Sequence, residues 1–222
     1  ITPWGLFLLI FSLLWAMSIP SFGRVRGANG VEIIDARTVG IYDVQVIRSE
    51  RGDLLIAWLN EHGFRYSSED QAAFDAHIRS GWCFVVANVN PKALEDSNYA
   101  GHGGLVPPLA LRFEAPSPVY PLALTATGGH DTEVLIYLLS DRKMLCDERL
   151  RLKFAGEVEL HEWFKDRLSH DIDPPEFFEG RSFDYSYLTK YGGLLTPEQM
   201  KEDLTFTPAE DRTPYREHKI VW

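Results

Sequence analysis

An uncharged, apolar stretch of sixteen residues, Trp4 to Ile19, constrains this chain more than any other part of its sequence. Thr2 can cap a helix that begins there, and Pro3 suits a first helical position. At about 1.5 Å per residue, sixteen helical residues span roughly 24 Å. The uncharged run over residues 1–22 just reaches the length of about 20 residues that crosses a bilayer. We therefore predict a single N-terminal transmembrane helix within residues 1–23.

The predicted anchor contains aromatic residues of the kind that settle at lipid boundaries and small residues that permit close helix packing. These anchor residues are Trp4, Gly5, Ser12, Trp15 and Ala16. A secretory signal peptide is the alternative, because Ala16 and Ser18 are small residues at positions that a signal peptidase inspects. We interpret the stretch as an uncleaved anchor in contact with the lipid bilayer.

The remainder of the chain has the composition of a water-soluble domain. The chain is 45% apolar and has 13 Phe, 9 Tyr and 6 Trp, which is enough for a hydrophobic core. Its net charge is −10, without runs of like charge. Such an acidic surface argues against nucleic acid and anionic headgroups as partners, and it would suit a basic partner.

Hydrophobic periodicity predicts an α+β fold. Leu54, Leu55, Trp58 and Leu59 share one helical face, which predicts a helix over 53–62, and a second helix is predicted over 67–80. Strands are predicted over 31–36, 38–47, 82–89, 109–115, 119–126, 132–140 and 149–155. We expect an antiparallel sheet with both helices on one face.

The predicted domain organisation follows from these elements. Residues 1–23 are the anchor, 24–30 a linker and 31–204 one extracytoplasmic domain, which ends in a short helix that starts at Thr196. Residues 205–222 are polar and have few apolar side chains to offset their ordering entropy. We therefore predict an extended C-terminal tail, which docks on an adjacent subunit through Tyr215 and Trp222.

Candidate reactive residues are few. Cys83 and Cys146 could form one disulfide, or each could be a small buried residue. His102, His130 and Asp131 lack the spacing of metal ligands. No nucleophile elbow or phosphate-binding loop is present. The sequence thus predicts no catalytic residue, no cofactor and no metal site.

Several segments together resemble a known family. They are TVGIYDVQVI (38–47), AWLNEHGF, SGWCFVVANVNP, PPLALRF, SPVYPLALT and YLTKYGGLLTPEQMKEDLTF (187–206). This combination resembles the later half of an uncharacterised bacterial exported family, known only as domain of unknown function twenty-three thirty, here joined to the anchor. The resemblance implies a periplasmic domain, although Arg24 and Arg26 would favour the cytoplasm under the positive-inside rule. It implies no activity.

Three functions follow as expectations. The first is a non-catalytic, single-span accessory subunit of a bacterial inner-membrane complex of the photosynthetic reaction-centre–antenna or respiratory type, with the other subunits as its partners. The alternative is a membrane-tethered periplasmic binding module for a soluble protein or an envelope ligand. An exported hydrolase is third.

Overall fold

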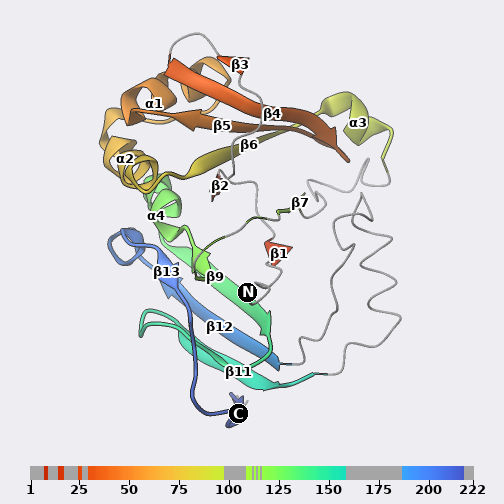
Figure 1. The fold of residues 1–222 in the computed structure, drawn as a ribbon, viewed down its shortest axis with the longest axis vertical. Helices are drawn as coiled ribbons and strands as arrows, with labels where there is room; N and C mark the ends of the chain where they lie inside the picture. Colours follow the sequence, from red (N-terminus) through yellow and green to blue (C-terminus); the bar gives the residue numbers. More distant parts are fainter. Residues whose placement is uncertain are drawn as a thin grey trace. The chain divides into compact units, whose positions relative to one another are not determined.

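The fold comes from a computed structural model, which describes residues 8–9, 15–17, 25–26, 30–97, 109–111, 113, 115, 117–158 and 187–217 (Figure 1). The chain divides into two compact units, each with its own antiparallel sheet. We call them the five-stranded unit, which holds the described residues of 15–109 and 121–128, and the four-stranded unit, which holds most of the rest.

The five-stranded unit is built on one antiparallel sheet, whose strands differ in length. Its strands, in spatial order, are β2 (Trp15–Met17), β6 (Cys83–Val89), β5 (Tyr42–Ser49), β4 (Val31–Val39) and β3 (Val25–Arg26). Gly40 lies in the turn between β4 and β5 with a φ of 56°, a conformation that glycine adopts without steric cost. The two predicted strands are confirmed as β4 and β5, but the turn between them lies inside the second predicted segment, 38–47, whose first two residues belong to β4.

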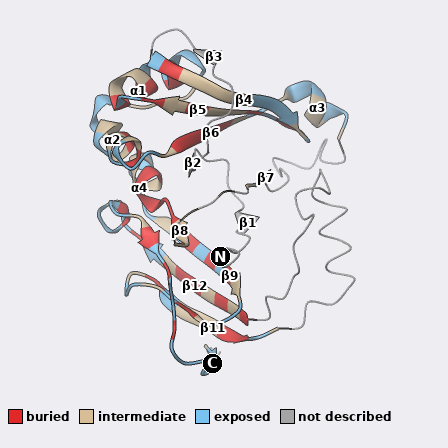
Figure 2. Cartoon of the chain, in the orientation of Figure 1, coloured by how far each residue is buried: buried red, intermediate tan, exposed pale blue. Residues whose placement is uncertain are grey.

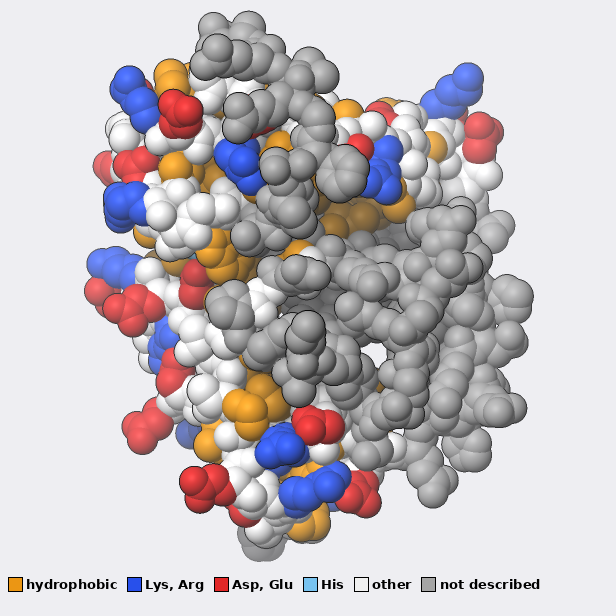
Figure 3. All heavy atoms as spheres, viewed as in Figure 1, with side chains coloured by type: hydrophobic (Ala, Val, Ile, Leu, Met, Phe, Trp, Pro, Cys, Tyr) orange, Lys and Arg blue, Asp and Glu red, His pale blue; other side chains and the backbone are white. Residues whose placement is uncertain are grey.

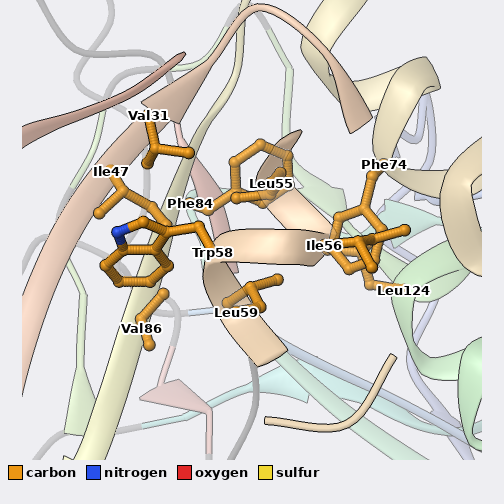
Figure 4. Packing of buried hydrophobic residues seen from close by; sticks show 10 residues of the cluster. All are labelled: Val31, Ile47, Leu55, Ile56, Trp58, Leu59, Phe74, Phe84, Val86 and Leu124. Atoms are coloured by element: carbon orange, nitrogen blue, oxygen red, sulfur yellow. The ribbon is translucent and has the colours of Figure 1, made fainter. Parts of the chain in front are cut away.

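The helices of this unit supply the other half of its core. They are α1 (Gly52–Glu61), η2 (Ser68–Asp70), α2 (Gln71–Arg79), α3 (Pro91–Glu95), α4 (Leu122–Thr125) and η3 (Ala126–Gly128). Buried apolar side chains from α1, α2, α4 and the sheet form one cluster, drawn in Figure 4. The Asp75 carboxylate on α2 accepts a hydrogen bond from the Gly52 N–H at 2.8 Å and so caps α1. Both helices predicted from the periodicity are confirmed.

The four-stranded unit has a second sheet with the order β15 (Tyr215–Arg216), β11 (Arg151–Glu157), β12 (Tyr187–Leu195) and β9 (Thr132–Ser140). Short pairs flank it: β8 (Val119–Tyr120) with β13 (Leu204–Thr205), and β10 (Met144–Leu145) with β14 (Thr207–Pro208). A 3-10 turn, η5 (Glu198–Met200), follows β12. A further two-stranded sheet joins β1 (Leu8–Leu9) to β7 (Leu109–Ala110).

The prediction of one continuous N-terminal helix is wrong at the residues that the structure describes there. Residues 8–9 and 15–17 are strands, and β2 pairs with β6 as an edge of the five-stranded sheet. A short apolar run is compatible with a buried strand as well as with a helix. Here residues 15–17 form a strand because they pair with the edge of β6. Within the described segments, no helix has the length and apolar character needed to cross a bilayer.

Four further predictions differ from the structure. The run over 119–126 is not one strand, because Pro121 separates the two-residue β8 from the short helix α4. The single domain predicted over 31–204 is instead divided between two units. Among the described residues of 109–115, the strand is the two-residue β7, and the helix expected from Thr196 is the 3-10 turn η5.

The predicted tail is also built into the fold as far as residue 217. Phe206 and Ala209 are buried, β14 pairs with β10, and β15 pairs with β11. The Tyr187 hydroxyl donates to the Arg212 carbonyl oxygen at 3.1 Å. Residues 205–217 are therefore not a free tail, because the groups that hold them come from the strands of their own unit.

Candidate binding face

The two faces of the four-stranded sheet differ in chemistry. Neighbouring residues on a strand point to opposite faces, and residues paired across strands share a face. On β9, Val134, Ile136 and Leu138 are buried, whereas the alternate residues Leu135 and Tyr137 are exposed. Figure 2 shows this alternation along β9. We call the side that carries Leu135 and Tyr137 the open face.

Buried hydrogen bonds fix the opposite side of the sheet. The Thr189 hydroxyl on β12 accepts a hydrogen bond from the Met144 N–H at 3.1 Å. The Tyr191 hydroxyl donates to the Met144 carbonyl oxygen at 3.0 Å and accepts the Cys146 N–H at 3.3 Å. Because these polar groups are satisfied on one side, the register that presents the open face on the other side is strongly specified.

Large apolar side chains are exposed on the open face. Leu194 is 66% exposed, Leu135 48% and Tyr137 47%. Gly192 lies across from Leu135, and a Cβ at this glycine would lie 3.1 Å from the Leu135 Cδ1. The glycine therefore lets Leu135 lie flat over the strand pair. Contiguous exposed apolar side chains of this kind mark interaction surfaces more often than isolated ones do.

Cations border these apolar side chains. Lys190 lies over the Tyr137 ring with its Nζ 4.8 Å from the ring centroid. Arg151 is paired with Gly192, and Arg216 on β15 is paired with Phe154, so both arginines share the open face. Neither arginine forms an ion pair with any residue in the described part of the chain. Figure 3 shows basic and hydrophobic side chains close together on the visible surface of this unit.

The open face is locally basic although the chain is acidic. Along the paired strands it carries Arg151, Lys190 and Arg216 against a single carboxylate, Glu133. Nearby Lys153 is neutralised by Glu217 at 2.9 Å. The net charge of −10 suggested a basic partner, whereas the charge on this face complements an acidic one.

The predicted anchor and docking residues are only partly described. Trp4, Gly5, Ser12 and Trp222 lie outside the described residues, and so does His102. The backbones of Trp15 and Ala16 lie in β2. Tyr215 lies in β15, where its backbone pairs with Ala155 and its side chain is exposed, so its role in docking stays a prediction.

The two cysteines are free thiols in the structure. Cys83 is fully buried in β6 and accepts a hydrogen bond from the Arg48 guanidinium at 3.3 Å. Cys146 is half-buried in the other unit, and burial, with a further contribution from the Asp147 charge, raises the pKa of its thiol to about 11. The structure thus does not contain the disulfide, and the pairing stays a prediction.

Metal-ligating side chains do not cluster where the structure describes them. No three His, Cys, Asp or Glu residues of these segments are placed to hold an ion. His130 and Asp131 lie in the turn before β9. The predictions of no catalytic residue and no cofactor stay predictions.

Sequence reasoning did not find the open face. The segment 132–140, TEVLIYLLS, is apolar on both faces, so its pattern does not show which side is exposed. The signal that could have found it is the neighbouring pair Gly192-Gly193 with Lys190 in a strand otherwise rich in apolar residues.

Comparison with known families gives one match. The sequence profile of a family described as "Uncharacterized protein conserved in bacteria (DUF2330)" matches residues 15–207. Neither a search of curated proteins nor a search of solved structures finds a match. The matched segment begins with β2 and includes every strand of the four-stranded sheet except β15. Because this segment covers most of the chain, the chain belongs to the DUF2330 family of uncharacterised bacterial proteins.

Proposed function

We propose that this chain is a non-catalytic binding protein whose open face docks an acidic, partly apolar protein partner. The observation that carries the proposal is a set of side chains on one regular sheet face. Leu135, Tyr137 and Leu194 are exposed there, and they share the face with Arg151 and Arg216, neither of which pairs with a carboxylate of the described segments. An apolar centre beside basic groups is the composition of an interface that excludes water and selects its partner by charge.

A rigid scaffold supports this role. The open face lies on paired strands rather than on loops, and β9 and β12 pair over nine residues without a register shift. A preformed surface of this kind loses little conformational entropy when a partner binds. The exposed side chains can therefore contribute to affinity instead of offsetting a cost of ordering.

The proposal keeps the binding role and the export expected from the sequence, and it does not rely on the membrane anchor. The accessory-subunit role in an inner-membrane complex was based on a helix over Trp4 to Ile19, and residues 8–9 and 15–17 are strands. If the chain does serve such a complex, the open face is the surface that we expect to contact the neighbouring subunit. The exported hydrolase has no observation in its favour.

Charge reversal on the open face tests the proposal. We expect the double variant Arg151→Glu with Arg216→Glu to lose the proteins that co-purify with the native full chain, because an acidic partner would then meet carboxylates. The matched control is Arg65→Glu with Arg79→Glu, two exposed arginines of the five-stranded unit that change the net charge equally. Equal loss in both variants, or retention in both, would overturn the proposal.

A further inference from the structure

The outer edge of β9 is the feature that carries a further inference. In the order β15-β11-β12-β9, this strand lies at the end of the sheet, and among the described strands it pairs only with β12. Its nine residues, Thr132 to Ser140, are in continuous register without a bulge. An edge strand presents a row of backbone N–H and C=O groups that can pair with another strand.

The other edge strands are protected, whereas no strand in the described part of the chain pairs with the outer edge of β9. Strand β15 at the opposite edge has only two residues and is flanked by the Lys153–Glu217 ion pair. The edge strands of the five-stranded sheet, β2 and β3, have three and two residues. Beyond its short pairing with β3, the strand β4 has a bulge between Ile33 and Asp35, and Asp35 and Arg37 place charges along it. Proteins use short length, bulges and charges to prevent edge pairing. Strand β9 has no Pro, Gly, Lys or Arg, and its one charge is Glu133.

We propose that the β9 edge pairs with β9 of a second copy of this chain, antiparallel about a two-fold axis at Ile136. In this register Leu135 lies opposite the Tyr137 of the second copy, and Val134 lies opposite Leu138, so apolar residues meet on both faces. Glu133 lies opposite Leu139 and not opposite its own copy. The strand is therefore complementary to itself, and the two four-stranded sheets become one continuous sheet.

The distribution of charge along the β9 edge favours a second copy as the occupant. Two chains of net charge −10 repel each other over most of their surfaces. Strand β9 carries one carboxylate in nine residues, and Lys190 lies beside it over Tyr137. The edge of β9 is thus a surface on which two copies can approach without placing like charges directly opposite each other.

The test is the mass of the full chain in solution, measured by sedimentation at micromolar concentration. We expect the native chain to form a dimer of twice its 25.3 kDa mass. The double variant Leu135→Glu with Tyr137→Glu places carboxylates opposite each other at two symmetric positions, and we expect its dissociation constant to rise about thirtyfold. Both side chains are exposed, so an unchanged circular dichroism spectrum should show that the fold is intact.

A charge-matched pair of variants tests the register itself. Leu135→Lys with Tyr137→Glu places opposite charges across the two-fold axis, so this variant should have a lower dissociation constant than the Glu–Glu variant. A native chain that remains monomeric, or one that takes up an extended peptide but no second copy, would overturn the proposal. Equal dissociation of both variants would also overturn it. The partner-docking proposal stands apart, because reversal of Arg151 and Arg216 does not alter β9.

Discussion

Replacement of Arg149 by methionine should loosen the segment that follows β12. The Arg149 guanidinium donates to the carbonyl oxygens of Glu202 at 2.6 Å, Gln199 at 2.9 Å and Asp203 at 3.0 Å. It also pairs with the Asp147 carboxylate, 2.6 Å from its Nη2. One planar side chain thus holds η5 and the residue before β13 against the turn that precedes β11. A guanidinium can do this because it carries several donors in a fixed plane.

The size of the expected loss of stability depends on which of the Arg149 hydrogen bonds water can replace. Hydrogen bonds to charged groups contribute about 1.5–3 kcal/mol each when they are shielded. The bonds to Gln199 and Glu202 are exposed, so water can take over those carbonyls, whereas the bond to Asp203 is partly buried. We therefore expect Arg149→Met to lower the free energy of unfolding by about 2–3 kcal/mol and the melting temperature by about 4–12 °C.

Hydrogen exchange provides the local assay, and a second arginine provides the control. Amide protons of β13 and β14 should exchange faster in Arg149→Met and in Arg149→Lys, because an ammonium cannot reach four partners at once. Arg142→Met is the matched change, since Arg142 is 51% exposed and pairs with an exposed Asp141. Arg142→Met should lower the free energy of unfolding by less than about 0.5 kcal/mol. If the two methionine variants had equal effects, Arg149 would not hold this segment.

Two further predictions concern the covered side of the four-stranded sheet. Tyr191→Phe should destabilise the protein by about 1–2 kcal/mol in chemical denaturation, because the Met144 carbonyl loses its donor, whereas Tyr137→Phe at the exposed ring should change stability by less than about 0.5 kcal/mol. Equal effects would contradict the role given to the Tyr191 hydroxyl. The Cys146 thiol should resist iodoacetamide in the native protein at neutral pH and react faster as pH rises toward its pKa of about 11, since only the thiolate attacks. A rate profile with a midpoint near pH 8.5, followed by mass spectrometry, would show that burial does not raise this pKa.

The sequence predicted those elements whose local pattern is compatible with only one type of secondary structure. The hairpin of β4 and β5 has two β-branched runs around Gly40, and the helix α1 has an apolar face that ends before Gly63. The apolar run over 132–140 is β9 at the predicted residues. In each case, the local preference of the segment agrees with its tertiary surroundings.

The predictions that failed depended on partners distant in the sequence. The N-terminal apolar stretch fits a membrane helix by composition, and its strand β2 is selected by pairing with β6. The polar segment after Leu204 has few apolar residues of its own, but buried Phe206 and the Arg149 fork hold it. Periodicity within a segment contains no information about either contact.

The open face could not be predicted because exposure is a property of the assembled sheet. In the sequence, Leu135 and Leu138 are equivalent, and pairing with β12 places the first outward and the second inward. Arg151 and Arg216 are 65 residues apart in numbering and share one sheet face only because β15 pairs with β11. Overall composition therefore indicated an acidic protein and did not reveal its basic face.

Photo-crosslinking in cells tests the docking role of the open face most directly. A photoreactive amino acid at Leu194, which is 66% exposed on this face and lies across from Glu133 of β9, should cross-link to a protein chain other than a second copy of this one. The matched position is Leu145 on β10 of the same unit, which is 43% exposed and outside the sheet face. We expect a cross-linked product at 194 that is absent at 145 and that disappears with Arg151→Glu. Products of equal yield at both positions, or no product at 194, would contradict the account.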